Sequence, residues 1–255
     1  LEGATGKPPL GRAASVKLWK DTVNNKTFAV VASGAYGVAV VDMTAFLASG
    51  SPSDLGLDKL IKTFEPLKAD ADNPWGSADG KSVDVHVVGD IAYFSYDSFG
   101  LVAYRMADLT LPVAQYEPVV IPDGQMLGIC ATAEVTKLSA KQGGVGECRP
   151  AAAGYFKLQN QVGYESLDGG ALYMTPQLFP TVYRNAAGQV VTHDKPRLLF
   201  YVGYGDAGVI KLDWSDVANP SMLAIKGVIG GGGATAINNG RVYVAAGTGG
   251  LTVLK

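Results

Sequence analysis

Four stretches of the chain share one pattern of hydrophobic and polar positions. In each stretch, a run rich in β-branched, aromatic and small apolar residues leads into a short turn that ends on glycine, and a second apolar run follows. The stretches are residues 27–43, 91–106, 198–214 and 241–255. Because β-branched and aromatic residues favour strands and glycine favours turns, each stretch predicts a β-hairpin. Four hairpins of the same anatomy indicate an internal repeat.

The spacing of the repeat predicts the fold. The glycines that end the four turns are Gly37, Gly100, Gly208 and Gly250. They lie 63, 108 and 42 residues apart, and about 42 residues is the length of one four-stranded propeller blade. We therefore predict an all-β fold: a β-propeller built from blades of about 42 residues, with a long insertion at residues 109–195 and a further blade within that interval. It forms a single domain over residues 1–255, alone or as part of a larger propeller.

The hairpins have predicted neighbours that would complete each blade. Residues 82–88 and 234–237 precede two of the hairpins and are expected to be inner strands, next to a central channel. Residues 14–19 have two interpretations. They either supply a missing fourth strand to the last blade and close the ring, or they form the inner strand of the first blade, which leaves an outer edge open.

The second arms of the hairpins also resemble a known family. Residues 37–42 (GVAVVD), 100–104 (GLVAY) and 208–213 (GVIKLD) are similar to LVIVD repeats. The resemblance covers the four hairpins, and the chain departs from it at Arg105 and over residues 109–195. It implies a β-propeller from a bacterium or archaeon that is exported or associated with the cell surface. The family carries no catalytic signature, so the resemblance implies architecture and location rather than chemistry.

Composition and charge exclude several classes of protein. The 21 Lys and Arg residues are balanced by 23 Asp and Glu, and no basic block occurs, which argues against a nucleic-acid partner. No uninterrupted apolar run approaches the ~18 residues of a membrane span. The chain begins at Leu1 rather than Met, so we expect a processed or truncated product. We expect it outside the cell or at the cell surface, with the periplasm as the alternative.

The two cysteines, Cys130 and Cys148, flank a glycine-rich stretch. A disulfide between them would close a loop of about 19 residues and contribute about 3 kcal/mol, provided the compartment is oxidising. The alternative is a pair of unpaired thiols in the insertion. No CxxCH motif is present, so we expect no covalent haem in this chain, and no CxxC or HExxH motif suggests zinc.

Asp84 and His86 are the candidate ligand-binding residues. They alternate along the predicted inner strand, so both side chains can face the channel and bind a cation or a small polar ligand. The alternative is a pair hydrogen-bonded to neighbouring strands. Residues 203–208 match GxGxxG, but a strand rather than a helix follows, so we interpret them as a hairpin turn.

One loop has a calcium interpretation, although we predict no cofactor. It is rich in oxygen ligands, at Asp70, Asp72, Asn73 and Asp79. Calcium prefers six to eight such ligands, but the spacing is not that of an EF-hand, and Asp and Asn are also common in turns.

The aromatic residues of the insertion have two interpretations as well. They either form a contact surface or complete the core of a divergent blade.

Two functions from different classes fit these patterns. The first is a non-enzymatic, exported β-propeller that acts as a protein-interaction or structural module at the cell surface, with a protein partner or self-assembly. The second is a propeller enzyme, a hydrolase or a metal-dependent oxidase, with its site at the channel mouth near Asp84 and His86. The absence of catalytic motifs and the family resemblance favour the first.

Overall fold

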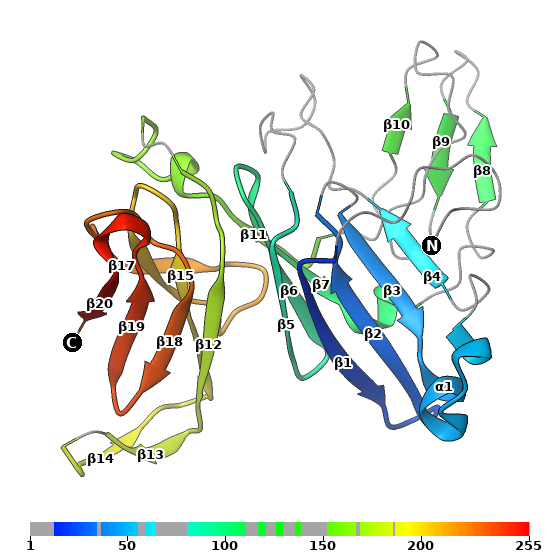
Figure 1. Ribbon diagram of the computed structural model, residues 1–255, viewed down its shortest axis with the longest axis horizontal. Helices are drawn as coiled ribbons and strands as arrows, with labels where there is room; N and C mark the ends of the chain where they lie inside the picture. Colours follow the sequence, from blue (N-terminus) through cyan, green and yellow to red (C-terminus); the bar gives the residue numbers. More distant parts are fainter. Residues whose placement is uncertain are drawn as a thin grey trace.

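The computed structural model describes most of the chain. The described residues are 13–34, 37–55, 60–64, 81–110, 117–120, 126–129, 136–138, 152–166, 169–185 and 187–254. Within them the protein consists mostly of antiparallel β-sheets, with a few short helices. The prediction of an all-β fold is confirmed. Figure 1 shows the sheets following one another along the long axis, with the N-terminal strands at one end and the C-terminal strands at the other.

Two four-stranded sheets form the N-terminal part. The first sheet has the order β1 (Ser15–Asp21), β2 (Lys26–Ala32), β3 (Val38–Asp42) and β4 (Leu60–Phe64). The second sheet has the order β5 (Asp84–Val88), β6 (Ile91–Tyr96), β7 (Gly100–Arg105) and β11 (Gly154–Phe156). Residues 14–19 therefore belong to an inner strand: β1 pairs with β2 of its own hairpin.

Two further sheets form the C-terminal part. The third sheet has the order β12 (Met174–Phe179), β15 (Arg197–Gly203), β16 (Val209–Asp213) and β17 (Ser221–Lys226). The fourth sheet has three strands in the described residues: β18 (Thr235–Asn238), β19 (Arg241–Ala245) and β20 (Leu251–Leu254). The side of β20 away from β19 is thus a sheet edge within the part of the chain that the structure describes.

The remaining elements are short. A separate sheet has the order β10 (Thr136–Leu138), β9 (Met126–Ile129) and β8 (Glu117–Val120), and β13 (Val182–Arg184) pairs with β14 (Val190–Thr192). The helices are α1 (Thr44–Ser49) and α2 (Met106–Leu109), with 3-10 turns η1 (Pro52–Leu55), η5 (Leu158–Asn160) and η6 (Gly247–Gly249).

All four predicted hairpins are present, and they share one register. The equivalent cross-strand pairs are Val30↔Val40, Tyr93↔Ala103, Tyr201↔Lys211 and Tyr243↔Val253. Each turn ends on a glycine with a positive φ, between 72° and 106°. A positive φ is costly for residues with a Cβ, so the repeated glycine has a conformational cause.

Residues 109–195 do not form one insertion outside the sheets. The fourth strand of the second sheet, β11, and the first strand of the third sheet, β12, both lie in this interval. The hairpin pattern could not reveal them, because β11 has three residues and β12 contains Pro176. What interrupts the repeat is a segment between β7 and β11, which includes β8 to β10, and a hairpin, β13–β14, between β12 and β15.

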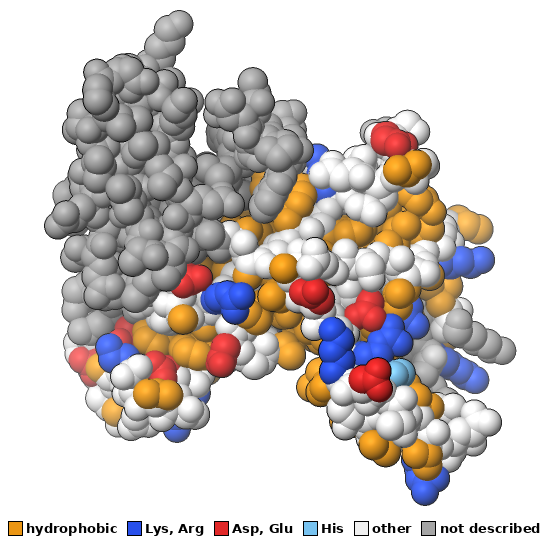
Figure 2. Space-filling view, turned by 180° about the vertical axis from the view of Figure 1, so that it is seen from behind, with side chains coloured by type: hydrophobic (Ala, Val, Ile, Leu, Met, Phe, Trp, Pro, Cys, Tyr) orange, Lys and Arg blue, Asp and Glu red, His pale blue; other side chains and the backbone are white. Residues whose placement is uncertain are grey.

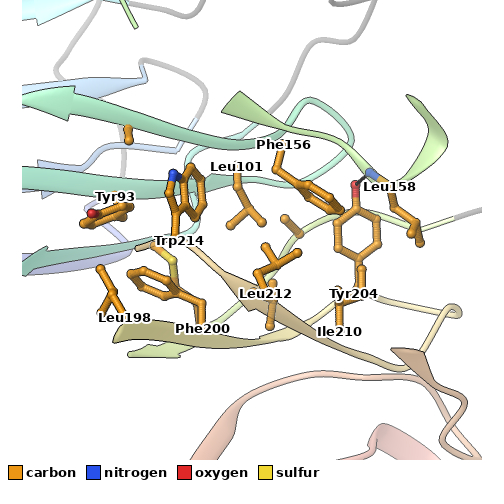
Figure 3. Packing of buried hydrophobic residues seen from close by; sticks show 14 of the residues in the cluster. Tyr93, Leu101, Phe156, Leu158, Leu198, Phe200, Tyr204, Ile210, Leu212 and Trp214 are labelled. Atoms are coloured by element: carbon orange, nitrogen blue, oxygen red, sulfur yellow. Dashed lines mark hydrogen bonds between the residues drawn. The ribbon is translucent and has the colours of Figure 1, made fainter. Parts of the chain in front are cut away.

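The four sheets pack face to face in chain order. Their first strands, β1, β5, β12 and β18, lie next to one another in succession, and an apolar cluster fills each interval between sheets. Figure 3 shows the cluster between the second and third sheets. There Trp214 is fully buried, with its ring 5.1 Å from Tyr93 and 5.7 Å from Phe200. Buried aromatic side chains of this size dominate the stability of a core.

Tyr204 ends the same cluster with its polar tip satisfied. Its hydroxyl accepts a hydrogen bond from the Leu158 amide at 3.2 Å, drawn in Figure 3, and donates one to Oε1 of Gln159 at 3.1 Å. Burial raises the pKa of Tyr204 to about 12 although the Leu158 hydrogen bond lowers it. The phenol is therefore neutral at physiological pH, as suits a residue of the core.

Candidate functional site

Asp84 lies at the start of β5, where three sheets meet. Its side chain is nearly buried, and its Oδ1 accepts a hydrogen bond from the amide of Val85 at 2.9 Å. Its Oδ2 accepts a hydrogen bond from the amide of Met174 on β12 at 3.1 Å and lies 3.3 Å from Nε2 of His86. The hydroxyl of Ser15 on β1 also hydrogen-bonds to the carboxylate. One carboxylate thus joins the first strands of three successive sheets.

The hydrogen bonds decide the charge of this group. Burial alone would raise the pKa of Asp84, but the hydrogen bonds from His86, Ser15 and the Met174 amide outweigh it and lower that pKa below its usual value. Asp84 is therefore ionised at neutral pH. Donors pointed at a buried carboxylate stabilise its charged form, so the site is built to hold a negative charge between the strands.

The sequence-predicted pair is brought together, but its geometry favours the structural interpretation. Both oxygens of Asp84 already accept hydrogen bonds from protein groups, which leaves little capacity for a ligand. The His86 side chain is about one-fifth exposed, so it is the part of the pair in contact with solvent. Within the described residues no three His, Cys, Asp or Glu side chains gather in a way that could hold a metal ion.

Sequence reasoning missed the role of Ser15. The residue is the first of β1, and β1 lies beside β5. A serine that begins a strand carries no signal by itself, since its hydrogen bond to Asp84 depends on the approach of two strands, β1 and β5, that are more than 60 residues apart in the sequence. A similar link joins the next two sheets: the Thr175 hydroxyl of β12 donates to the carbonyl oxygen of Thr235 on β18 at 2.6 Å.

Several other predictions concern residues that the structure does not describe. Cys130 and Cys148 lie outside the described residues, and so do the four oxygen-rich positions of the calcium hypothesis, Asp70, Asp72, Asn73 and Asp79. The disulfide and the calcium site stay predictions.

The GxGxxG match at 203–208 does form the turn between β15 and β16, and no helix follows it. The hairpin interpretation of that motif is confirmed.

The β13–β14 hairpin projects from the third sheet and carries exposed apolar side chains. On the hairpin, Val182 and Val190 are more than half exposed, and so is Leu178, near the end of β12. Three rings pack together at the base of the hairpin. The ring centroid of Tyr183 lies 4.7 Å from that of Phe179 and 5.7 Å from that of His193. Figure 1 shows the hairpin extending away from the sheets, and Figure 2 shows apolar side chains beside charged ones on that projection.

The aromatic residues of the interval 109–195 divide between the two predicted roles. Phe156 is buried in the cluster between the second and third sheets, and Tyr164 packs against it. The Tyr155 hydroxyl donates to the carbonyl oxygen of Phe99 at 2.7 Å, and burial raises the pKa of that phenol. Tyr173, by contrast, is exposed. Some of these residues therefore complete the core and others are available for contact.

Comparison with known proteins assigns no family to the chain. No protein-family model matches it, and no curated protein matches it. Among the described residues, no helix has the length and apolar character needed to cross a bilayer.

Three solved structures align with most of the chain at low similarity. They are BamB from Moraxella catarrhalis (11% identity, TM-score 0.36, 95% of this chain and 58% of that one), virginiamycin B lyase from Staphylococcus aureus (11%, 0.27, 96% and 70%) and the computationally designed Ika8 protein (9%, 0.29, 94% and 70%). The chain thus spans a little over half the length of the first of these. With scores this low, we base no conclusion about fold or function on these alignments.

Proposed function

We propose that this chain is an exported β-propeller module of the LVIVD-repeat type, which acts at the cell surface by binding protein partners rather than by catalysis. The fold part of the proposal is supported by four sheets with equivalent hairpins, whose first strands lie side by side in chain order. This is the arrangement by which propeller blades bury faces that they cannot bury alone.

The observation that carries the interaction role is the projecting β13–β14 hairpin. It holds Val182 and Val190 out to solvent, while the rings of Phe179, Tyr183 and His193 order its base. Exposing apolar side chains on a projecting element is unfavourable in water unless a partner covers them. A rigid base lowers the ordering cost of binding, so the hairpin suits a contact with another protein.

The alternative, a propeller enzyme with its site at Asp84 and His86, has less support. A general base or a metal ligand needs a lone pair directed at the substrate or metal. The hydrogen bonds that Asp84 accepts from Val85, Met174, His86 and Ser15 already use its oxygens. We therefore assign Asp84 to the linking of strands.

Site-specific photo-crosslinking in the source cells tests the proposed function. A photoreactive amino acid replaces Val190 on the hairpin or, as the matched control, Val23 in the exposed turn between β1 and β2. We expect a discrete cross-linked species at position 190 and none at position 23, and we expect externally added protease to digest the protein on intact cells. The proposal is wrong if both positions cross-link alike or if the protein is inaccessible from outside.

A further inference from the structure

The three junctions between successive sheets are built in the same way. In each, the residue that begins the turn of one sheet forms an isolated antiparallel bridge with a residue just before the first strand of the next sheet. The bridges are Gly34↔Ser82, Asp97↔Ala171 and Gly205↔Gly232. In the first of them, the Gly34 amide donates to the Ser82 carbonyl oxygen at 3.1 Å, and the Ser82 amide donates back at 2.9 Å. Each junction therefore has two parts. We call the turn of the earlier sheet the turn half, and the residues that lead into the first strand of the next sheet the strand half.

The fourth sheet ends in another turn half. Its turn repeats the backbone hydrogen bonds of the third sheet: the Ala246 amide donates to the Gly250 carbonyl oxygen, as the Tyr204 amide does to that of Gly208. Gly247 occupies the position of Gly205, with φ of 51° against 49°. Within the described part of the chain, Gly247 forms no such bridge to a following strand.

The first sheet begins with another strand half. The Ala14 amide donates to the Ala32 carbonyl oxygen, as the Val83 amide does to that of Ser95. Ala13 therefore occupies the position of Ser82, which in the first junction pairs with Gly34. For Ala13, too, the described residues include no bridge of this kind.

Side-chain burial shows the same two unfilled halves. The residue after the turn glycine is buried at every interior junction: Val38 and Leu101 are 0% exposed and Val209 is 4% exposed, whereas the equivalent Leu251 is 70% exposed. The residue three positions after the bridge residue Ser82 or Ala171 is buried, at Val85 in the second sheet and Met174 in the third. The equivalent residue of the first sheet, Val16, is 54% exposed. Two residues further along β1, Leu18 is 58% exposed.

We infer that the turn half of the fourth sheet binds the strand half of the first sheet of a second copy of this chain, so that two copies join head to tail. The occupant is a second copy because each end matches the other end rather than itself, and a second copy presents the matching end. Contacts of this type close into a ring when the rotation allows it. Figure 1 places the turn half of the fourth sheet and the strand half of the first sheet at opposite ends of the row of sheets. Two junctions between two copies would therefore cover both halves of each copy.

This inference goes beyond the interaction role proposed above, because it uses a different surface of the molecule. The proposed function depends on the β13–β14 hairpin, whereas self-association depends on Val16 and Leu18 at one end and Leu251 at the other. Substitutions at the two surfaces therefore separate the two claims.

Light scattering after size-exclusion chromatography of the 255-residue chain tests the inference. We expect the unmodified chain to have twice its monomer mass of 26.5 kDa. Leu251→Asp and Leu18→Asp each place a charge in the junction, which should weaken the dimer by about 100-fold or more, because an unpaired buried charge is costly. Val182→Asp is the matched control on the hairpin, and that variant should remain a dimer. Unchanged circular dichroism verifies that each variant is folded.

Mixing the two end variants identifies the kind of contact. Leu18→Asp retains an intact fourth sheet and Leu251→Asp retains an intact first sheet, so the mixture can form one unmodified junction. We expect a heterodimer in the mixture at concentrations at which each variant alone is monomeric. A monomeric unmodified chain at all concentrations would overturn the inference and indicate that further sheets or another protein cover the ends. A dimer that Val182→Asp alone disrupts, or a mixture without heterodimer, would also overturn it.

Discussion

The second and fourth sheets are built from the same hairpin but differ in what surrounds it. Leu101 and Leu251 each directly follow a turn glycine and lie in the third strand of their sheet, yet Leu101 is fully buried and Leu251 is mostly exposed. The second sheet has four strands and a neighbour on each face, whereas the described part of the fourth sheet has three strands and a neighbour on one face. The repeated sequence therefore specifies the strands and the turn, while burial depends on the neighbouring sheet.

The largest expected effect concerns the turn glycines of the third and fourth sheets. A Cβ on Gly208 would meet the Lys226 carbonyl oxygen and would lie 2.8 Å from the Gly227 Cα, whereas one on Gly250 meets nothing within 4 Å. Because both have positive φ, Gly250→Ala should cost about 1 kcal/mol of unfolding free energy. Gly208→Ala should cost about 4 kcal/mol, since overlap adds to the strain. Urea unfolding measures both, and equal losses would contradict the difference between the sheets.

The two leucines give the next largest effect. Leu101→Ala removes a fully buried side chain and should lower the free energy of unfolding by about 3 kcal/mol, through lost burial and a residual cavity. Leu251→Ala, measured at a concentration at which the chain is monomeric, should change it by less than about 0.5 kcal/mol. Denaturant titration of the two variants side by side checks this. Similar losses would mean that the outer face of the fourth sheet is covered within one copy.

Asp84 tests whether the interior junctions depend on polar links. Asp84→Ala leaves the Met174 amide without its acceptor and should cost about 2 kcal/mol at pH 7. Because the folded-state pKa of Asp84 is lowered, its contribution is fully present above the unfolded-state value of about 4 and is lost as the pH falls through the folded-state pKa. Asp84→Asn should therefore flatten the loss of stability below pH 4. An unchanged acid profile in that variant would contradict the assigned link.

The smallest effect concerns a link within one hairpin. Asp213, the last residue of β16, accepts hydrogen bonds from the Ser215 amide at 3.0 Å and from Nε of Arg197 at 3.1 Å. Burial alone would raise its pKa, but the Ser215 and Arg197 hydrogen bonds lower it. Asp213→Ala should cost about 1 kcal/mol. Thermal unfolding compares it with Asp216→Ala at a neighbouring exposed carboxylate, which should have the smaller effect.

The hairpins were predictable because their signals are local. A glycine with positive φ and two flanking apolar runs, as around Gly208, require no knowledge of distant residues. The pairing of β11 with β7 was not predictable in this way. It places Phe156 opposite Leu101 across 55 residues of sequence, and a three-residue strand carries no periodicity of its own.

The candidate site shows the same limit. Alternation along a strand correctly placed Asp84 and His86 on one face, and the structure brings them within 3.3 Å. It could not reveal that Ser15 and the Met174 amide also hydrogen-bond to the carboxylate, because those groups come from the sheets on either side. These long-range contacts decide between the ligand-binding and the structural interpretation of Asp84 and His86.

Hydrogen exchange followed by mass spectrometry, on dilute monomeric protein, tests the central claim most directly. The claim is that equivalent third strands differ because only the interior ones have neighbours on both sides. We predict that amides of β7 and β16 exchange at least about tenfold more slowly than those of β20. The outer edge of β20 is unpaired within the described residues. Equal protection of β20 and β16 would contradict the account, because it would mean that the fourth sheet is already completed within one copy.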